Sequence, residues 1–155
     1  MRPITAIRFL HKGKKILAWA GPKQGVRVID GEQWLPYQPA TFLTPPCAEY
    51  VSGHSTFSAA SAEVLRLFTG SDYFGAAAVL PAGSSSIEPG LTPRGPVILS
   101  WSTFSEAADE AGLSRRYGGI HFEDGDLQGR AMGRRIGAIV WAKALTYVYG
   151  AANAR

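Results

Sequence analysis

The last third of the chain carries four glycines at intervals of four residues, and this spacing limits what the segment can form. They are Gly125, Gly129, Gly133 and Gly137. Residues four apart lie on one face of an α-helix, and the surrounding apolar pattern predicts a helix from near Asp124 to Tyr149. Each glycine inside a helix costs about 1 kcal/mol relative to alanine. The glycine face therefore predicts a second helix in unusually close contact, which compensates for that cost.

Other segments also predict helices, separated by long loops rich in proline and glycine. Helices are predicted over residues 2–10, 53–69 and 103–111, with Gly70 and Gly112 as the stop signals of the last two. Thr103-Phe104-Ser105-Glu106 has the form of a capping box. Residues 12–46 and 81–96 are predicted to be mostly loop. A short hairpin turned by Asp30-Gly31 would pair residues 26–29 with 33–35. The expected fold class is all-α, a helical bundle.

Composition is compatible with one ordinary globular domain. The chain has 155 residues, of which 46% are hydrophobic, and its single Cys47 allows no intrachain disulfide. The net charge is +4, with Lys12, Lys14 and Lys15 close together, but no nucleic-acid motif accompanies them. Neither a signal peptide nor a membrane span is predicted, so a soluble protein of undetermined cellular location is expected.

One candidate anion-binding segment starts the predicted helix 53–69. There Ser52 and Gly53 precede His54. The first amides of a helix lack partners within it and, with the helix dipole, attract anions. Taken alone, Ser-Gly-His at a helix start is more typical of an ordinary cap.

A second candidate segment runs from Ser114 to His121 with the sequence SRRYGGIH. The planar guanidinium of Arg115 suits oxyanions, and Gly118-Gly119 permits close approach of the backbone. Taken alone, this segment too is more typical of a surface arginine pair followed by a half-buried histidine.

Considered together, these segments resemble the signature of the vanadium-dependent haloperoxidase and type 2 phosphatidic acid phosphatase superfamily. That signature is K-x6-RP, PSGH and S-R-x5-H-x3-D, in this order. The matching residues are Arg2-Pro3, Ser52-Gly53-His54, Ser114-Arg115 and His121. The strings TPPCAEYVSGHSTFSAASAEVL and SRRYGGIHFEDGDLQGRAMG are similar to the soluble bacterial branch. The resemblance covers nearly the whole chain, residues 1–155, as the C-terminal portion of such a domain.

The resemblance implies a pocket for tetrahedral vanadate, or for phosphate in the phosphatases. It implies that Arg2 and Arg115 neutralise the oxygens of the anion, and that Ser52 and the Gly53 amide donate further hydrogen bonds. A multiply charged oxyanion needs several such donors because an unpaired charge in a dry pocket is costly.

Catalytic roles are implied in the same way for two histidines. His121 would be the ligand to vanadium, or the nucleophile that becomes phosphohistidine in a phosphatase. His54 would be the acid–base group. The leading hypothesis is an enzyme that oxidises halide with hydrogen peroxide and so halogenates a small organic substrate. The alternatives are a phosphatase of phosphate monoesters and a truncated, non-catalytic module.

Several positions depart from the family pattern. Val51 replaces the usual proline before Ser-Gly-His, and Cys47 stands where relatives carry an aromatic residue or histidine near the halide. Gly125 occupies the final position of H-x3-D, between Asp124 and Asp126, so the carboxylate that orients His121 is not identified.

The family lysine would lie seven residues before Arg2, ahead of the first residue of this sequence. Family members are also about twice this size. The sequence therefore predicts a bundle that is incomplete on its N-terminal side, with an apolar flank that favours self-association or a partner chain.

Overall fold

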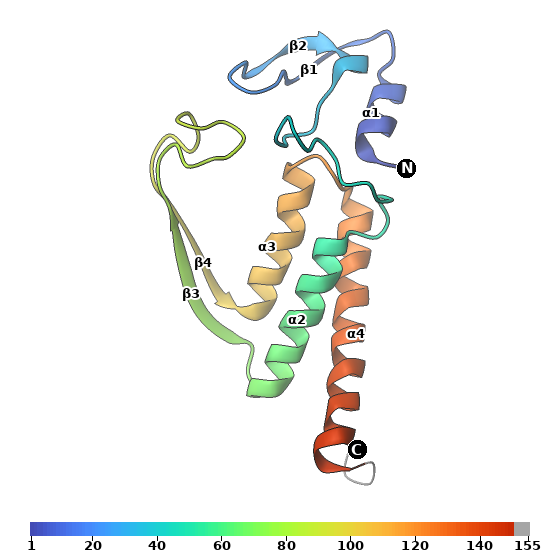
Figure 1. Ribbon diagram of the computed structural model, residues 1–155, viewed down its shortest axis with the longest axis vertical. Coiled ribbons are helices and arrows are strands. Elements are labelled where there is room, and N and C mark those ends of the chain that lie inside the picture. Colours follow the sequence, from blue (N-terminus) through green and yellow to red (C-terminus); the bar gives the residue numbers. More distant parts are fainter. Residues whose placement is uncertain (151–155) are drawn as a thin grey trace. The chain divides into compact units, whose positions relative to one another are not determined.

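The computed structural model describes residues 1–150, which form four α-helices, one short 3-10 helix and four strands (Figure 1). In chain order they are α1 (Pro3–Leu10), β1 (Lys15–Trp19), β2 (Val26–Asp30), η1 (Gly31–Gln33), α2 (Gly53–Thr69), β3 (Tyr73–Leu80), β4 (Val97–Thr103), α3 (Phe104–Tyr117) and α4 (Glu123–Tyr149). No helix among these residues is both long and apolar enough to cross a membrane.

The chain divides into two compact units, each built from several separate segments. The first contains Met1–Tyr50, Ala77–Ser100 and Arg115–Phe122. The second contains Val51–Ala76, Trp101–Ser114 and α4. The second unit thus holds α2 and α4, whereas the first holds α1 and the strand pair β1–β2.

Helices α2 and α4 lie side by side and make the most extensive contact between two elements of the described chain (Figure 1). All four glycines of α4 are buried. A Cβ atom built on Gly129 would lie 2.9 Å from the main-chain oxygen of Ser52. One built on Gly137 would lie 2.6 Å from the main-chain oxygen of Ala60. The close helix approach predicted from the glycine spacing is therefore confirmed, and α2 is the partner.

Small residues of α2 face Gly129 and Gly133, among them Ser55 and Ala59, whereas Glu63 lies beside Gly137. Ala59 is 1% exposed and Ser55 is fully buried. Small side chains on both helices allow the two backbones to approach, so the glycines lose helix propensity but gain close packing.

The boundaries of α2 agree with the sequence, whereas α3 is longer than predicted. Helix α2 covers residues 53–69 and ends at Gly70, whose φ is 71°. The capping box is confirmed, because Glu106 N donates to Thr103 Oγ1 (2.9 Å) and Thr103 N donates to Glu106 Oε2 (3.0 Å). Gly112, predicted as the stop signal, instead lies buried inside α3. There is no space for a side chain at this position, because a Cβ atom built on Gly112 would lie 2.3 Å from Asp126 Oδ1.

The all-α prediction is only partly right, because two small two-stranded sheets accompany the helices. Strand β1 pairs antiparallel with β2, and Leu17 lies opposite Val28. The predicted hairpin was therefore wrong in its pairing. Residues 26–30 pair with the preceding strand β1 and not with residues 33–35, and Gly31–Gln33 form η1. Strands β3 and β4 form the second sheet. They flank the loop 81–96, which was predicted as a loop.

Replacing a contact glycine should separate α2 from α4. In Gly133→Ala the new methyl group would lie 2.2 Å from the main-chain oxygen of Thr56 and 2.9 Å from the Cβ of Ala59. We expect the free energy of unfolding to fall by about 1–3 kcal/mol, although alanine is the better helix former by about 1 kcal/mol. Urea unfolding followed by circular dichroism measures this. The control is Gly95→Ala, where the added Cβ meets no atom within 4 Å. Equal stability of both variants would contradict the close-contact interpretation.

Candidate functional site

Ser52 caps α2 and is held in place from two directions. It has extended backbone angles (φ −66°, ψ 119°), and its Oγ accepts a hydrogen bond from Ser55 N at 3.3 Å. Its own main-chain N–H donates to Gly125 O at 2.9 Å. Ser52 is fully buried, whereas Gly53 and His54 are exposed in the first turn of α2. The cap accepts through Oγ, so the hydroxyl proton is still available to a ligand.

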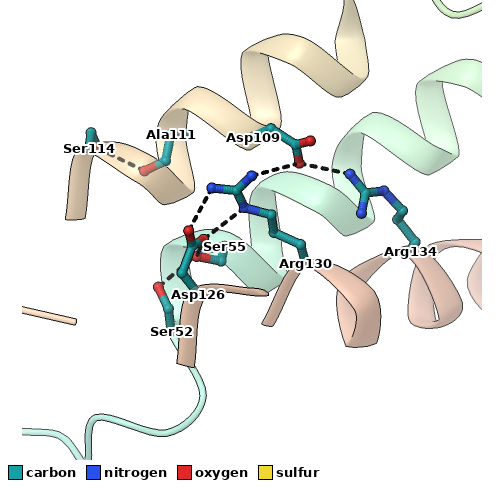
Figure 2. Close-up of polar contacts among 8 residues, drawn as sticks. All are labelled: Ser52, Ser55, Asp109, Ala111, Ser114, Asp126, Arg130 and Arg134. Carbon is teal, nitrogen blue, oxygen red and sulfur yellow. Dashed lines mark hydrogen bonds and ion pairs between the residues drawn. The ribbon is translucent and has the colours of Figure 1, made fainter. Parts of the chain in front are cut away.

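Beneath this helix start lies a buried carboxylate, that of Asp126 in the first turn of α4 (Figure 2). Asp126 is fully buried and accepts a hydrogen bond from Ser55 Oγ at 2.7 Å. The guanidinium of Arg130 binds it through two nitrogens, at 2.8 and 2.6 Å. A buried charge is tolerated when it is paired and hydrogen-bonded in this way. The interaction links the first turn of α2 to α4.

The same arginine extends the network to α3 (Figure 2). Arg130 Nη1 lies 3.6 Å from Asp109 Oδ1. The same oxygen accepts a hydrogen bond from Arg134 Nη2 at 2.7 Å. Later in α3, Ser114 Oγ donates to the main-chain oxygen of Ala111 at 2.7 Å, so this serine of the Ser-Arg motif bonds to its own helix. These ion pairs fix α3 and α4 near the capped end of α2.

Arg115, in the last turn of α3, carries a buried donor without a partner. Among the described residues its Nε is buried and makes no hydrogen bond. Burial lowers the pKa of the Arg115 guanidinium below its usual value. A buried donor that is left unpaired is unfavourable, most of all on a charged group. An oxyanion would supply the missing acceptor, so this residue fits a bound vanadate or phosphate.

The chain then turns back towards His121. Gly119 adopts a left-handed conformation (φ 71°), and a Cβ there would lie 3.1 Å from the Trp34 ring and 3.2 Å from Pro36. Gln38 Nε2 donates to Gly118 O at 3.2 Å. Both glycines therefore serve the packing of this loop on residues 34–38, a role that was not predicted.

His121 is buried and its ring is held by Glu49. Only 4% of the His121 side chain is exposed, and its Nδ1 lies 2.8 Å from the main-chain oxygen of Glu49. A carbonyl oxygen only accepts hydrogen bonds, so Nδ1 is the protonated nitrogen. In the neutral imidazole Nε2 then carries the free lone pair. This nitrogen has the electron pair that a ligand or nucleophile needs.

The predicted site residues are divided between the two units. Arg2, Arg115 and His121 belong to the first unit; Ser52, Gly53 and His54 belong to the second. Arg2 is exposed and is the N-cap residue of α1, where its main-chain oxygen accepts from Thr5 N at 3.0 Å. That all six bind one anion stays a prediction. Within residues 1–150 no group of three or more His, Cys, Asp or Glu side chains is arranged to hold a metal ion.

Sequence reasoning missed three residues of this region. Asp126 and Arg130 are four apart on one helix, a spacing that favours an ion pair and could have been noticed. Glu49 lies in a loop, 72 residues before His121, and no periodicity connects them. Only the folded chain reveals that contact.

Comparisons with known proteins give one family and several related structures. The family model of the VCPO second helical-bundle domain matches residues 1–150. The structure of a bacterial vanadium-dependent chloroperoxidase in its apo form matches with a TM-score of 0.89 and 29% identity, over 96% of this chain and 31% of that chain. Its holo form matches with a TM-score of 0.88 and the same identity and coverage, 29%, 96% and 31%.

A bacterial vanadium-dependent iodoperoxidase matches with a TM-score of 0.50 and 36% identity, over 72% of this chain and 23% of that chain. The chain thus spans about a third of the length of the chloroperoxidase chains, 31%. A comparison with curated proteins gave no match.

Removing the buried carboxylate should destabilise the second unit strongly. Asp126→Ala leaves Arg130 and Ser55 without their shared partner. We expect the free energy of unfolding to fall by about 3–5 kcal/mol, as when one member of a buried ion pair is removed. Asp124→Ala is the matched control, since Asp124 is exposed in the same helical turn and should contribute no more than about 1 kcal/mol. Chemical unfolding of both variants measures the difference, and similar values for the two would contradict a structural role for Asp126.

Proposed function

Because the chain belongs to the vanadium haloperoxidase family, through the VCPO second helical-bundle domain, we propose that it supplies the vanadate-binding residues of such an enzyme. The proposed reaction is the oxidation of halide by hydrogen peroxide, which leads to halogenation of a small organic substrate. The related structures are a chloroperoxidase and an iodoperoxidase, both described as vanadium-dependent.

The observation that carries this proposal is the buried Nε of Arg115, which has no hydrogen-bond partner among residues 1–150. Folding alone gives no reason to bury a guanidinium donor without an acceptor, because that arrangement costs free energy. A tetrahedral oxyanion offers the acceptor and the opposite charge together, and arginine binds such anions through two parallel hydrogen bonds. Arg2 would neutralise a second part of the anion.

Ser52 and Gly53 support the same proposal from the start of α2. The Ser52 hydroxyl has a proton to donate, and nothing lies within 4 Å of a Cβ atom built on Gly53. The Gly53 amide is in the first turn, where the helix dipole favours negative charge. These groups would donate hydrogen bonds to the anion without any rearrangement of the helix.

The two histidines would have different tasks. His121, with Nδ1 protonated, would offer the Nε2 lone pair to vanadium. His54, exposed in the first turn of α2, would exchange protons with the peroxide or with the leaving oxygen. When bound, vanadate would activate hydrogen peroxide so that an oxygen atom can be transferred to the halide.

Phosphate would meet the same donors, so hydrolysis of phosphate monoesters is the competing activity. In that reaction the Nε2 of His121 would attack phosphorus and form phosphohistidine, and His54 would protonate the leaving oxygen. Halide-dependent peroxide consumption with vanadate, set against monoester hydrolysis without it, separates the two activities.

Loss of the Arg115 guanidinium should weaken anion binding. In Arg115→Leu we expect the dissociation constants of vanadate and of inorganic phosphate to rise about 10- to 100-fold, because one charge-assisted contact is worth about 1.5–3 kcal/mol. Isothermal titration calorimetry measures both constants. The charge-matched control is Arg135→Leu, since Arg135 is exposed on α4. If the wild type, Arg115→Leu and Arg135→Leu bind vanadate and phosphate equally tightly, the proposed function is wrong.

Substitutions of the two histidines should have separable effects. His121→Ala removes a direct ligand, so we expect loss of vanadate binding and of halide-dependent peroxide consumption. His54→Ala removes an acid–base group, so turnover should fall by about 10²- to 10⁴-fold while vanadate still binds. Vanadium-51 NMR reports binding, and halide-dependent peroxide consumption reports turnover. If both variants lost vanadate binding equally, the two roles would be assigned wrongly.

A further inference from the structure

We propose that Glu49 is the positioning residue of His121, which it holds with Nδ1 protonated and Nε2 free for the anion. This inference rests on the proposed function for the identity of the anion. The family pattern puts an orienting carboxylate four residues after His121, where this chain has Gly125. Glu49 takes over that task from a different segment.

The first contact is made by the main chain of Glu49. Its carbonyl oxygen lies 2.8 Å from Nδ1 of His121, a normal hydrogen-bond length. Since the carbonyl cannot donate, it selects the tautomer with hydrogen on Nδ1. The hydrogen bond at Nδ1 and the burial of the side chain together fix the orientation of the His121 ring.

The second contact is made by the carboxylate of the same residue. Glu49 Oε1 accepts a hydrogen bond from Phe122 N at 2.9 Å and lies 3.7 Å from Nδ1 of His121. Only 12% of the Glu49 side chain and 4% of the His121 side chain are exposed, so solvent screens this pair weakly. Glu49 therefore binds both the ring of His121 and the main chain of the next residue, Phe122.

Asp126, the buried carboxylate of α4, makes hydrogen bonds within its own unit. Asp126 accepts hydrogen bonds from Ser55 and Arg130 in the second unit. Gly125 has no side chain, and its carbonyl accepts from Ser52 N. Glu49, in contrast, is part of the first unit together with His121 and Phe122.

The negative charge of Glu49 has a consequence at the far side of the ring. When Nε2 donates its lone pair, positive charge builds up on the imidazole, and a carboxylate near Nδ1–H stabilises it. Outer partners of this kind typically change ligand affinity by about 10- to 100-fold. The carbonyl thus selects the tautomer, and the carboxylate strengthens the donor.

Three variants separate these contributions. Glu49→Ala removes both the acceptor for Phe122 N and the charge. Glu49→Gln keeps an acceptor oxygen but removes the charge. Glu32→Gln removes a charge from an exposed residue of η1 and is the matched control.

The first readout is the nitrogen-15 NMR spectrum of the histidine rings in the vanadate-free chain, at mildly alkaline pH where imidazoles are neutral. His121 is assigned by its absence in His121→Ala. We expect the Nδ1–H tautomer in the wild type, Glu49→Gln and Glu32→Gln. Glu49→Ala keeps the main-chain carbonyl but loses the Phe122 N–Oε1 hydrogen bond that holds residue 49 beside the ring. The carbonyl is then no longer fixed against Nδ1, so the signals should move towards a mixture of both tautomers. Wild-type signals in a folded Glu49→Ala chain would overturn the positioning role.

The second readout is vanadate affinity. We expect Glu49→Gln to bind about 10-fold more weakly than the wild type, and Glu49→Ala more weakly still. Glu32→Gln should match the wild type. If Glu49→Gln binds vanadate as tightly as the wild type, the proposed role of the charge is wrong. This result decides the point even if Glu49→Ala does not fold. A wild type that binds no vanadate would instead refute the proposed function, while the tautomer measurement would still decide the role of Glu49.

Discussion

The second unit depends on the contact between the glycine face of α4 and the small residues of α2. Because Gly129 has no side chain, the main chain of Ser52 can lie against α4, where Ser52 N bonds to Gly125 O. That bond fixes the residue that caps α2. The direction of the first amides of α2 follows from the cap. A packing feature of α4 therefore determines where Gly53 and His54 stand, although neither takes part in the packing.

The buried carboxylate of Asp126 and the buried Nε atom of the half-buried Arg115 differ in their hydrogen bonding. The carboxylate of Asp126 accepts hydrogen bonds from Ser55 and two from Arg130, so its charge is paired within the fold. The Nε of Arg115 is buried without a partner among the described residues. Because a fold gains nothing from an unpaired donor, the second case is the basis of the proposed anion site. The two groups thus differ in whether their hydrogen bonds are made within the described chain.

Much of the helical framework could be predicted from sequence because it depends on local signals. The spacing from Gly125 to Gly137 predicted the contact face, and Gly70 predicted the end of α2. A strand was predicted over residues 26–29, but its pairing with β1 was not. The strands β3 and β4 and the inner position of Gly112 were not predicted either, because they depend on contacts between separate segments of the chain. The same holds for Glu49 and His121, which no local pattern connects. The motif residues themselves were found by resemblance, and their meeting at one anion stays a prediction.

The glycine face has a further consequence, which concerns entropy. Gly129, Gly133 and Gly137 have no rotamers, and Ala59 has none either, so these four residues enter the contact without loss of side-chain freedom. Dispersion between the two closely spaced backbones contributes to the contact, and it fades within about an ångström of separation. Such a contact is either fully formed or absent, which makes the helix pair a rigid base for the residues at its end.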